Sequence, residues 1–516
     1  MDKTVTTKVT SALPWAVTAK IIMAMTGIAI SIIVVRFLGE YNYGVYSILR
    51  IILTFLSVFL AFGLRQAILR YLPEFKAKEQ YNNIKTLIIR TLLIQSFLWF
   101  VVLFVFFLVG DILDLWFRTD LKAYLLVAIS MSLLGTIFTT LQQVLTSLYE
   151  IKFITLNLLI RSFLLFGLTF VFLKIGLGIY GVFIAAGVCN LFIVFSFGWK
   201  LPKLLPFNFV PSITAALNSF DQKRILRYSF PIIGTGILNL IVWRQSEALF
   251  LGYFFSPLEA GYYNLAYQLP QQILEFIPLA IWPLILASFS EIYSKKRDNL
   301  GLALTTYYKL LFCITVPISI IGILLGDKAI IILYGEHMAK AGPLCQIFFL
   351  LFCIFSIETP LSMAFYILEK TWINLIILFS QAIINIGLDL LIIPRYGLYG
   401  AVVPVAIVLM ISPYFRYLIV KKFVLNLEIP WRFIGKTYFA SSPLLLLWIL
   451  RPYATTAISF SMIIIIAIFI LTLSVRYSNL IEQNELAILR DSSIPMKDLL
   501  LKILTKQFPT IKFAQE

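Results

Sequence analysis

The chain has 516 residues, of which 60% are hydrophobic and only 13% charged, and its mean hydropathy of +0.94 excludes a soluble globular protein. The formal net charge of +17 is mostly a signal of membrane topology, so nucleic acid is not an expected partner. His337 is the only histidine, and the four cysteines lack the CxxC spacing of a metal or redox site, so no histidine-based catalytic site or zinc centre is expected.

Apolar runs of about 20 residues, each long enough to cross roughly 30 Å of hydrocarbon, recur along the chain. They predict an all-α polytopic membrane protein with about 14 transmembrane helices. The first run is too long for a signal peptide and lacks a small-residue cleavage site, so we expect a retained helix. The predicted spans are 11–35, 44–70, 86–109, 122–148, 153–173, 179–199, 228–251, 260–288, 301–325, 342–367, 372–393, 398–420, 433–450 and 454–475.

The basic residues of the loops predict the orientation of these spans. The N-terminus, the even-numbered loops and the C-terminal tail hold 27 lysines and arginines, whereas the odd-numbered loops hold 8. Because cytoplasmic loops carry an excess of Lys and Arg, we expect both termini to be cytoplasmic. The expected location is the cell (cytoplasmic) membrane, in contact with membrane lipids.

The longest hydrophilic connection between spans, from Lys200 to Arg227, divides the first twelve spans into two lobes of six. The C-terminal residues mix charges with an apolar pattern, which is typical either of an amphipathic helix on the cytoplasmic face or of a disordered tail. The predicted organisation is an N-lobe at 1–200, a cytoplasmic linker at 201–227, a C-lobe at 228–422, two extra spans at 423–475 and a cytoplasmic amphipathic tail at 476–516.

The two lobes carry a weak internal repeat at a nearly constant offset. The matched positions are Gly44 with Gly261 at an offset of 217, and Glu150 with Glu369 and Gly178 with Gly397 at an offset of 219. Since six spans is an even number, both copies enter the membrane in the same direction. We therefore predict two six-helix lobes related by a pseudo-two-fold axis along the membrane normal, with the substrate near the midplane between them.

Four basic residues near span ends are counted with the loops above, and seven more fall inside predicted spans, where a central charge costs about 2.5 to 3.5 kcal/mol and usually faces a bundle interior or a watery cavity. Arg90 and Lys309 lie near the cytoplasmic edge, where we expect their side chains to snorkel. Arg65 is compatible with either environment, and the other four lie deeper and favour a cavity. The seven residues are Lys20, Arg50, Arg65, Arg90, Arg161, Arg244 and Lys309.

A cationic cavity suits an anionic headgroup such as a pyrophosphate, because arginine presents a rigid fork of donors to phosphate oxygens. Arg50 and Arg65 are 15 residues apart, which places them within about 60° of each other on one continuous helix. One wall of the cavity is therefore predicted to carry both. The predicted substrate-binding residues are Lys20, Arg50, Arg65, Arg161 and Arg244.

Acidic residues inside spans occur only in the second lobe. Gln381, Asn385 and Asp389 recur every four residues and predict one polar stripe on span 11. Glu247 on span 7 is within reach of Arg244 at i,i+3. Glu247, Asn385 and Asp389 are predicted either to hold a coupling cation or to act structurally, by neutralising Arg244 and by hydrogen bonds between helices.

Several phrases together resemble the polysaccharide-transporter branch of the multidrug/oligosaccharidyl-lipid/polysaccharide exporter superfamily. They are RFLGEYNYGVYSILR after span 1, LRYLPEF at the end of span 2, the repeated GYYNLAY, and LDLLIIPRYGLYGAVVPV from Leu388 to Val405. The resemblance covers spans 1 to 12 and implies a V-shaped two-lobe fold whose cationic cavity alternates between inward- and outward-facing states. Members of this branch flip polyprenyl-pyrophosphate-linked oligosaccharides from the cytoplasmic to the outer leaflet.

The resemblance also bears on the ion. Related lipid II flippases hold a cation with an acid on span 7 and an Asn-x3-Asp on span 11, and Glu247, Asn385 and Asp389 match that pattern. Span 12 offers few hydroxyl groups to complete such a site. The resemblance therefore implies coupling to Na+ or H+ without fixing which ion.

The expected function is a monomeric flippase for a lipid-linked oligosaccharide, with polysaccharide assembly proteins as further partners and without catalytic residues or a bound cofactor. One alternative is a multidrug/cation antiporter of the same superfamily, although a cavity with five bases in the N-lobe is poorly suited to cationic substrates. Another is a membrane enzyme such as a glycosyltransferase, for which the DILD at 111–114 is the best acidic motif. That motif is more simply interpreted as a turn in an outer loop.

Overall fold

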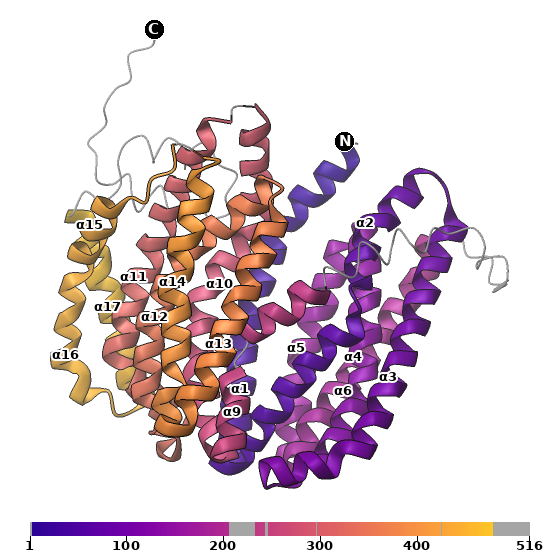
Figure 1. Ribbon diagram of the computed structural model, residues 1–516, viewed down its shortest axis with the longest axis horizontal. Coiled ribbons are helices and arrows are strands. Elements are labelled where there is room, and N and C mark those ends of the chain that lie inside the picture. The colour runs from indigo at the N-terminus through magenta and orange to yellow at the C-terminus, as the bar shows by residue number, and fades with distance from the viewer. Residues whose placement is uncertain (1–2, 206–232, 243–245, 296, 425, 478–516) are drawn as a thin grey trace. The chain divides into compact units, whose positions relative to one another are not determined.

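The structure is a computed structural model that describes residues 3–477, except 206–232, 243–245, 296 and 425 (Figure 1). All regular secondary structure in these residues is helical, which confirms the all-α prediction. Most of the predicted linker at 201–227 and nearly all of the predicted tail at 476–516 lie outside the described residues. The division into lobes and the amphipathic tail therefore remain predictions.

The helices follow one another with short connections. The first six are α1 (Lys3–Ala61), α2 (Leu64–Ala77), α3 (Tyr81–Phe117), α4 (Leu121–Ser147), α5 (Ile151–Lys174) and α6 (Gly178–Leu204). After an apolar helix at Ile233–Val242 come α9 (Ser246–Phe254), α10 (Pro257–Lys295), α11 (Asn299–Tyr334), η1 (Glu336–Met338), α12 (Ala341–Ile367), α13 (Thr371–Gly400) and α14 (Val402–Lys421). The last elements are α15 (Trp431–Ser441), η2 (Ser442–Leu446), α16 (Leu447–Leu450), η3 (Arg451–Tyr453) and α17 (Ala457–Tyr477).

The long helix α1 contains the first predicted span and most of the second. It is kinked at Gly39, whose φ of 72° and ψ of 175° lie in a region that essentially only glycine adopts. A side chain at this position would collide with its own backbone, so the glycine allows the chain to turn between the two spans. The kink lies within the RFLGEYNYGVYSILR segment that follows the first predicted span.

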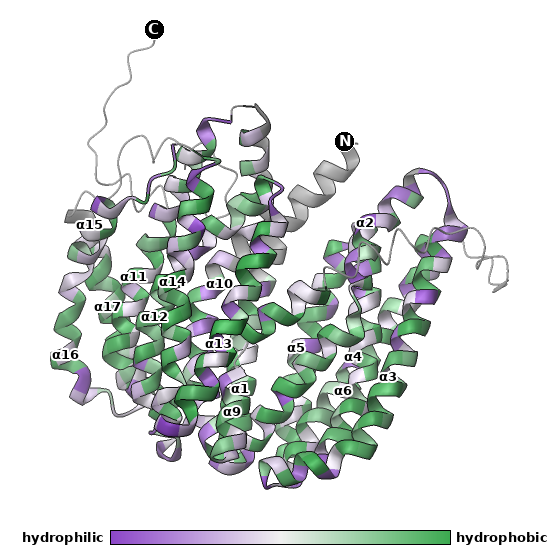
Figure 2. Ribbon diagram, viewed as in Figure 1, coloured by the Kyte–Doolittle hydropathy of each residue, from purple (hydrophilic) through white to green (hydrophobic). Residues whose placement is uncertain are grey.

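Ten helices in the described residues are long and apolar enough to cross a membrane, or eleven if the bent helix α12 is included. This number is lower than fourteen because α1 and α2 count once, as Ala19–Lys76, and because α10 is not among the ten. The predicted span at 228–251 also lies partly outside the described residues. Apolar residues run along most of each helix and polar residues gather toward the helix ends (Figure 2), as expected for a multi-pass membrane protein.

Proline explains the bend in α12. The segments Ala341–Ile354 and Ser356–Ile367 meet at 41°, just over one turn before Pro360. Proline has no backbone N–H to donate to the carbonyl four residues earlier, and its ring crowds that carbonyl.

The chain forms two compact units, and each is described by itself. Unit 1 falls within Met1–Asn264 and Leu378–Val405, and unit 2 falls within Leu265–Ile377 and Ala406–Glu516. In unit 1, α1 packs against α4, α5 and α6. One buried apolar cluster there joins α2, α3 and α4 around Ile68 and Val144, and a second joins α4, α5 and α6 around Ile193.

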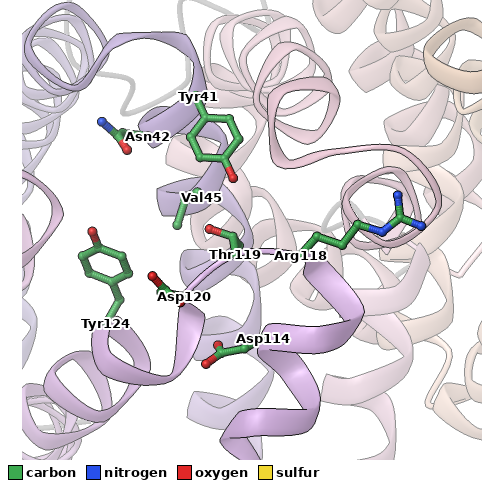
Figure 3. A pocket seen from close by; sticks show the side chains of 8 residues that line it. All are labelled: Tyr41, Asn42, Val45, Asp114, Arg118, Thr119, Asp120 and Tyr124. Atoms are coloured by element: carbon green, nitrogen blue, oxygen red, sulfur yellow. The ribbon is translucent and has the colours of Figure 1, made fainter.

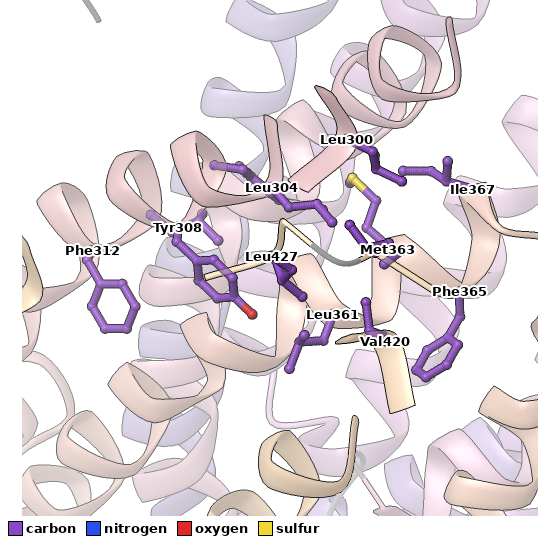
Figure 4. Close-up of a cluster of buried hydrophobic side chains, with 14 of the residues drawn as sticks. Leu300, Leu304, Tyr308, Phe312, Leu361, Met363, Phe365, Ile367, Val420 and Leu427 are labelled. Atoms are coloured by element: carbon purple, nitrogen blue, oxygen red, sulfur yellow. The ribbon is translucent and has the colours of Figure 1, made fainter. Parts of the chain in front are cut away.

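Unit 2 is built around α11, which packs against α12. One buried cluster brings together Tyr308, Leu361 and Val420 from α11, α12 and α14 (Figure 4). The two predicted spans outside the repeat pack on the same helix, because Leu324 of α11 shares a second cluster with Leu447 of α16 and residues of α17.

The predicted repeat has structural counterparts within unit 1. A Cβ atom added at Gly261 would lie 2.9 Å from the Cα of Gly44, and one added at Gly44 would overlap the carbonyl group of Pro257. The two matched glycines therefore touch each other through their backbones. Equivalent positions meet in this way at a two-fold axis. The matched glycines Gly178 and Gly397 also share a positive φ, of 52° and 56°.

The turns after α4 and α12 correct one part of the repeat. Tyr149 and Glu369 are both left-handed, with φ of 62° and 56°. In each turn the backbone N–H of the next residue donates to the carbonyl oxygen five residues earlier. Glu150 donates to Leu145 at 3.1 Å, and Lys370 donates to Phe365 at 2.9 Å. The backbones therefore match at an offset of 220. By this geometry Glu150 corresponds to Lys370, so its predicted match with Glu369 is wrong by one residue. The prediction aligned two identical glutamates, whereas the turns align the residues that donate the equivalent hydrogen bonds.

Candidate functional site

A cluster of buried polar side chains lies inside unit 1. Glu247, in the first turn of α9, is 1% exposed, Asn385 on α13 is 1% exposed, and Asp389 one turn further along α13 is 0% exposed. Gln381 is buried on the same face of α13, whereas Ile383 and Ile384 are exposed. The predicted polar stripe on this span is confirmed, and the structure brings Asn385 and Asp389 of the stripe to Glu247, the predicted acid of span 7.

The amide nitrogen of Asn385 links the members of this cluster. It lies 2.9 Å from Oε1 of Glu247, 3.5 Å from Oδ2 of Asp389 and 3.3 Å from Oγ of Ser246. The carbonyl oxygen of Ile241, near the C-terminal end of the Ile233–Val242 helix, lies 3.5 Å away. A single amide group thus bridges two carboxylates that come from different helices.

The cluster suits a hard cation. Its donor atoms are oxygens of two carboxylates, a hydroxyl and a carbonyl at a helix end, which is the kind of set that coordinates Na+ or H+ in transporters. Oδ1 of Asp389 is buried and accepts no hydrogen bond from the described residues. Two carboxylates buried together avoid the cost of uncompensated charge either by taking up protons or by binding a cation. Arg244, the predicted alternative partner, lies outside the described residues.

The cluster does not suit a transition metal. In the described part of the chain, no group of three or more His, Cys, Asp and Glu side chains is placed to hold a metal ion. Sites for zinc normally use three or four such ligands.

The predicted pairing of Arg50 with Arg65 on one wall assumes a continuous helix, and the structure interrupts that helix between them, so the pairing stays a prediction. Helix α1 ends at Ala61, and Phe62 and Gly63 both adopt positive φ, of 47° and 63°, before α2 begins. The rotation of 100° per residue therefore does not extend from Arg50 to Arg65. Arg65 is half-buried, and one of its guanidinium nitrogens lies 3.4 Å from the carbonyl oxygen of Ser57 in α1.

The other predicted basic residues of unit 1 differ in their surroundings. Lys20 is exposed and Arg50 half-buried, both on α1. Arg161 on α5 donates from Nε to Oδ1 of Asn190 at 3.1 Å, and its guanidinium carbon lies 5.3 Å from the ring centroid of Phe138. These contacts link α5 to α6 and α4, so Arg161 contributes to packing as well as to charge.

Unit 2 contains a buried arginine that is not among the seven predicted in-span bases. Arg416 on α14 is 1% exposed, and its Nε lies 2.9 Å from Oε1 of Glu358 on α12, which is 2% exposed. The arginine also donates to Asn374 of α13 and, at 3.2 Å, to Ser412. Arg416 lies only four residues from the predicted cytoplasmic end of its span, which made it look like a loop charge. The available sequence signal is Glu358, an acid inside the predicted span 342–367, because a buried acid in a span usually pairs with a base.

Comparison with known proteins identifies related chains. The model of a family described as "Polysaccharide biosynthesis protein" matches residues 33–343, which is more than half of this chain. The uncharacterized membrane protein MJ1068 of Methanocaldococcus jannaschii is 23% identical over 427 residues, covering 77% of this chain and 80% of that protein.

Solved structures share the fold at low sequence identity. A structure of the lipid II flippase MurJ in an inward closed conformation has a TM-score of 0.70 and 15% identity, covering 89% of this chain and 97% of that chain. An inward-facing multidrug resistance transporter of the MATE family, in the MOP superfamily, has a TM-score of 0.66 and 14% identity, covering 78% of this chain and 94% of that chain. The fold is therefore that of MOP superfamily transporters.

Proposed function

We propose that this chain, which belongs to the family of polysaccharide biosynthesis proteins, is a flippase that moves a polyprenyl-pyrophosphate-linked oligosaccharide from the cytoplasmic to the outer leaflet of the cell membrane. The family match carries this proposal, because it supplies the glycan as substrate class. The multi-pass architecture and the likeness in fold to MOP superfamily transporters support a transport step. We assign no catalytic residue, place both termini in the cytoplasm, and expect a monomer that meets polysaccharide assembly proteins.

Basic side chains would hold the pyrophosphate. The residues proposed for this role are Lys20, Arg50, Arg65, Arg161 and Arg244. Arg50 is the strongest of them, because it is half-buried in the middle of an apolar helix where an uncompensated charge is costly. The lipid tail is expected to stay in the bilayer while the headgroup crosses.

The buried cluster in unit 1 would couple transport to an ion, either Na+ or H+. A bound cation would supply the positive charge that Glu247 and Asp389 together lack. The amide of Asn385 donates to the carboxylates in this structure, and a rotation about its last side-chain bond would present its oxygen instead. An ion that binds one state of the transporter more tightly shifts the population toward that state.

The test is direct measurement of transbilayer movement of a polyprenyl-pyrophosphate oligosaccharide in proteoliposomes. We expect wild type to move the lipid and Arg50→Ala to lose most of the rate. Arg395→Ala is the matched control, because Arg395 is an exposed arginine near the end of α13. A wild type that moves no such lipid but exports a cationic drug would instead establish a multidrug antiporter, the alternative that shares this fold.

A further inference from the structure

Two sequence segments that play no part in the proposed transport path, one in α1 and one at the end of α3, meet in one pocket of unit 1. The pocket has a volume of about 530 Å³, within the range of about 300 to 1,000 Å³ that ligand sites commonly occupy. Tyr41 and Asn42 come from the GEYNYG turn of α1, and Asp114 comes from the DILD at the end of α3. The complete lining is Tyr41, Asn42, Val45, Asp114, Arg118, Thr119, Asp120 and Tyr124 (Figure 3).

A second cavity of about 410 Å³ adjoins the first, because both are lined by Asp114, Asp120 and Tyr124. It adds Lys122 of α4 and Tyr180 of α6, and the ring centroid of Tyr180 lies 4.6 Å from that of Tyr124. The two cavities together offer aromatic rings on several sides of a pair of carboxylates. Both lie at the end of unit 1 that the loop charges assign to the outside.

The turn that presents the carboxylates is held in place by its own contacts. Oδ1 of Asp114 accepts the backbone N–H of Lys122 at 2.7 Å, and the ammonium of Lys122 lies 2.8 Å from both carboxylate oxygens of Asp111. Arg118 ends α3 in a left-handed conformation, with φ of 52°. A site whose supporting residues are fixed in this way loses little conformational entropy when a ligand binds.

The pocket is lined by acceptors and aromatic rings. Asp114 and Asp120 accept hydrogen bonds only, while Asn42 and the tyrosine hydroxyls can both donate and accept. In Figure 3 the rings of Tyr41 and Tyr124 stand around Thr119 and Asp120, and the guanidinium of Arg118 extends away from Tyr124. The lining holds two carboxylates and one guanidinium, that of Arg118, and it has too few apolar walls for a lipid chain.

We propose that this pocket binds a sugar unit of a glycan on the outer face of the membrane. A pyranose ring carries several hydroxyl donors at fixed angles, which match acceptor-only carboxylates, and its C–H face packs on the electron-rich face of a tyrosine ring. This inference rests on the proposed function and adds a site to it. The pocket holds the glycan of the translocated lipid as it emerges, which disfavours its return.

The experiment is saturation-transfer NMR on the purified full chain in nanodiscs. The probes are glucose, galactose, mannose and N-acetylglucosamine, each alone, with choline as a cationic comparison. We expect at least one sugar to bind wild type. Tyr124→Ala and Asp120→Asn should each weaken its affinity about tenfold, the size expected from losing one ring face or one charged acceptor. Tyr124→Phe, which keeps the ring, should retain more affinity than Tyr124→Ala.

The control is Tyr453→Ala, which removes a tyrosine that is 69% exposed in unit 2 and should bind as wild type does. Asp120→Asn changes an exposed turn residue, so it keeps the test decisive if Tyr124→Ala does not fold. Binding of choline alone, binding of no sugar, or equal sugar affinity in all variants would overturn the inference. The same preparations are assayed for lipid movement. Movement without sugar binding refutes only this site, whereas sugar binding without movement refutes only the proposed flippase.

Discussion

Asp389 is the residue on which ion coupling depends most. It is fully buried beside Glu247 and Asn385, and one of its oxygens accepts no hydrogen bond from the described residues. The spacing of Asn385 and Asp389 could be predicted from sequence, because residues four apart share a helix face. The approach of Glu247 could not be derived from spacing, since it lies on another helix about 140 residues away, and only the family resemblance indicated it.

Asp389→Asn should abolish stabilisation by the coupling ion. If Na+ is that ion, wild type gains about 2.7 kcal/mol in unfolding free energy at a Na+ concentration of 100 times the dissociation constant. Thermal unfolding in NaCl and in choline chloride at equal ionic strength measures this difference. Asp298→Asn, at an exposed aspartate before α11, should respond as wild type does. An equal response of Asp389→Asn and wild type to Na+ would show that this carboxylate does not bind it.

Arg416→Met should destabilise the protein by about 3 to 5 kcal/mol, because it leaves the carboxylate of Glu358 buried without its partner. The double variant Arg416→Met with Glu358→Gln should recover much of this loss, since neither buried charge remains. Unfolding in detergent, analysed as a double-mutant cycle, gives the coupling between the two residues. Additive effects of the two changes would mean that the ion pair contributes nothing.

At the scale of the helix, the contact between α1 and α10 depends on two glycines. The backbones of Gly44 and Gly261 touch, and the hydroxyl of Tyr262 donates to Oε2 of Glu40 at 2.5 Å beside them. The match of the two glycines could be predicted from the repeat. Their direct contact could not, because an offset between two copies does not reveal which positions lie at the axis.

Gly44→Val should disrupt this helix contact, since its Cβ would overlap the carbonyl group of Pro257. We expect a loss of about 1 to 3 kcal/mol, the usual cost of overpacking, or a protein that does not fold. Gly27→Ala is the matched control in the same helix, because nothing lies within 4 Å of its added Cβ. That control should be neutral or slightly stabilising, since alanine favours a helix. Equal unfolding temperatures of Gly44→Val and wild type would contradict the close approach.

At the same scale, a shared wall for Arg50 and Arg65 does not follow from their spacing. A helical phase holds only while the helix continues, and Phe62 with Gly63 interrupts it after Ala61. An apolar sequence with one glycine gives little warning of such a break. The pocket lined by Tyr41 and Asp114 could not be predicted from the sequence either, because these residues lie far apart in the chain and meet only through the packing of α1 beside α3 and α4.

At the scale of the whole molecule, composition and periodicity were sufficient to predict a multi-pass all-α protein, because a chain with so few charges can satisfy its backbone in lipid only as helices or closed barrels. The predicted number of spans is harder to compare with the number of helices, since α1 runs through the kink at Gly39 and contains the first predicted span and most of the second. Transport itself does not follow from these features. We propose it from family membership and from the fold shared with solved transporters.

The most direct measurement is lipid-linked oligosaccharide movement in proteoliposomes under an imposed Na+ or H+ gradient, with wild type, Asp389→Asn and Asp298→Asn compared at equal protein density. We predict that wild type accelerates under one of the two gradients, that Asp298→Asn matches it, and that Asp389→Asn keeps its fold but no longer responds. Movement by wild type that is independent of both gradients, or an unchanged response of Asp389→Asn, would contradict coupling through the buried cluster.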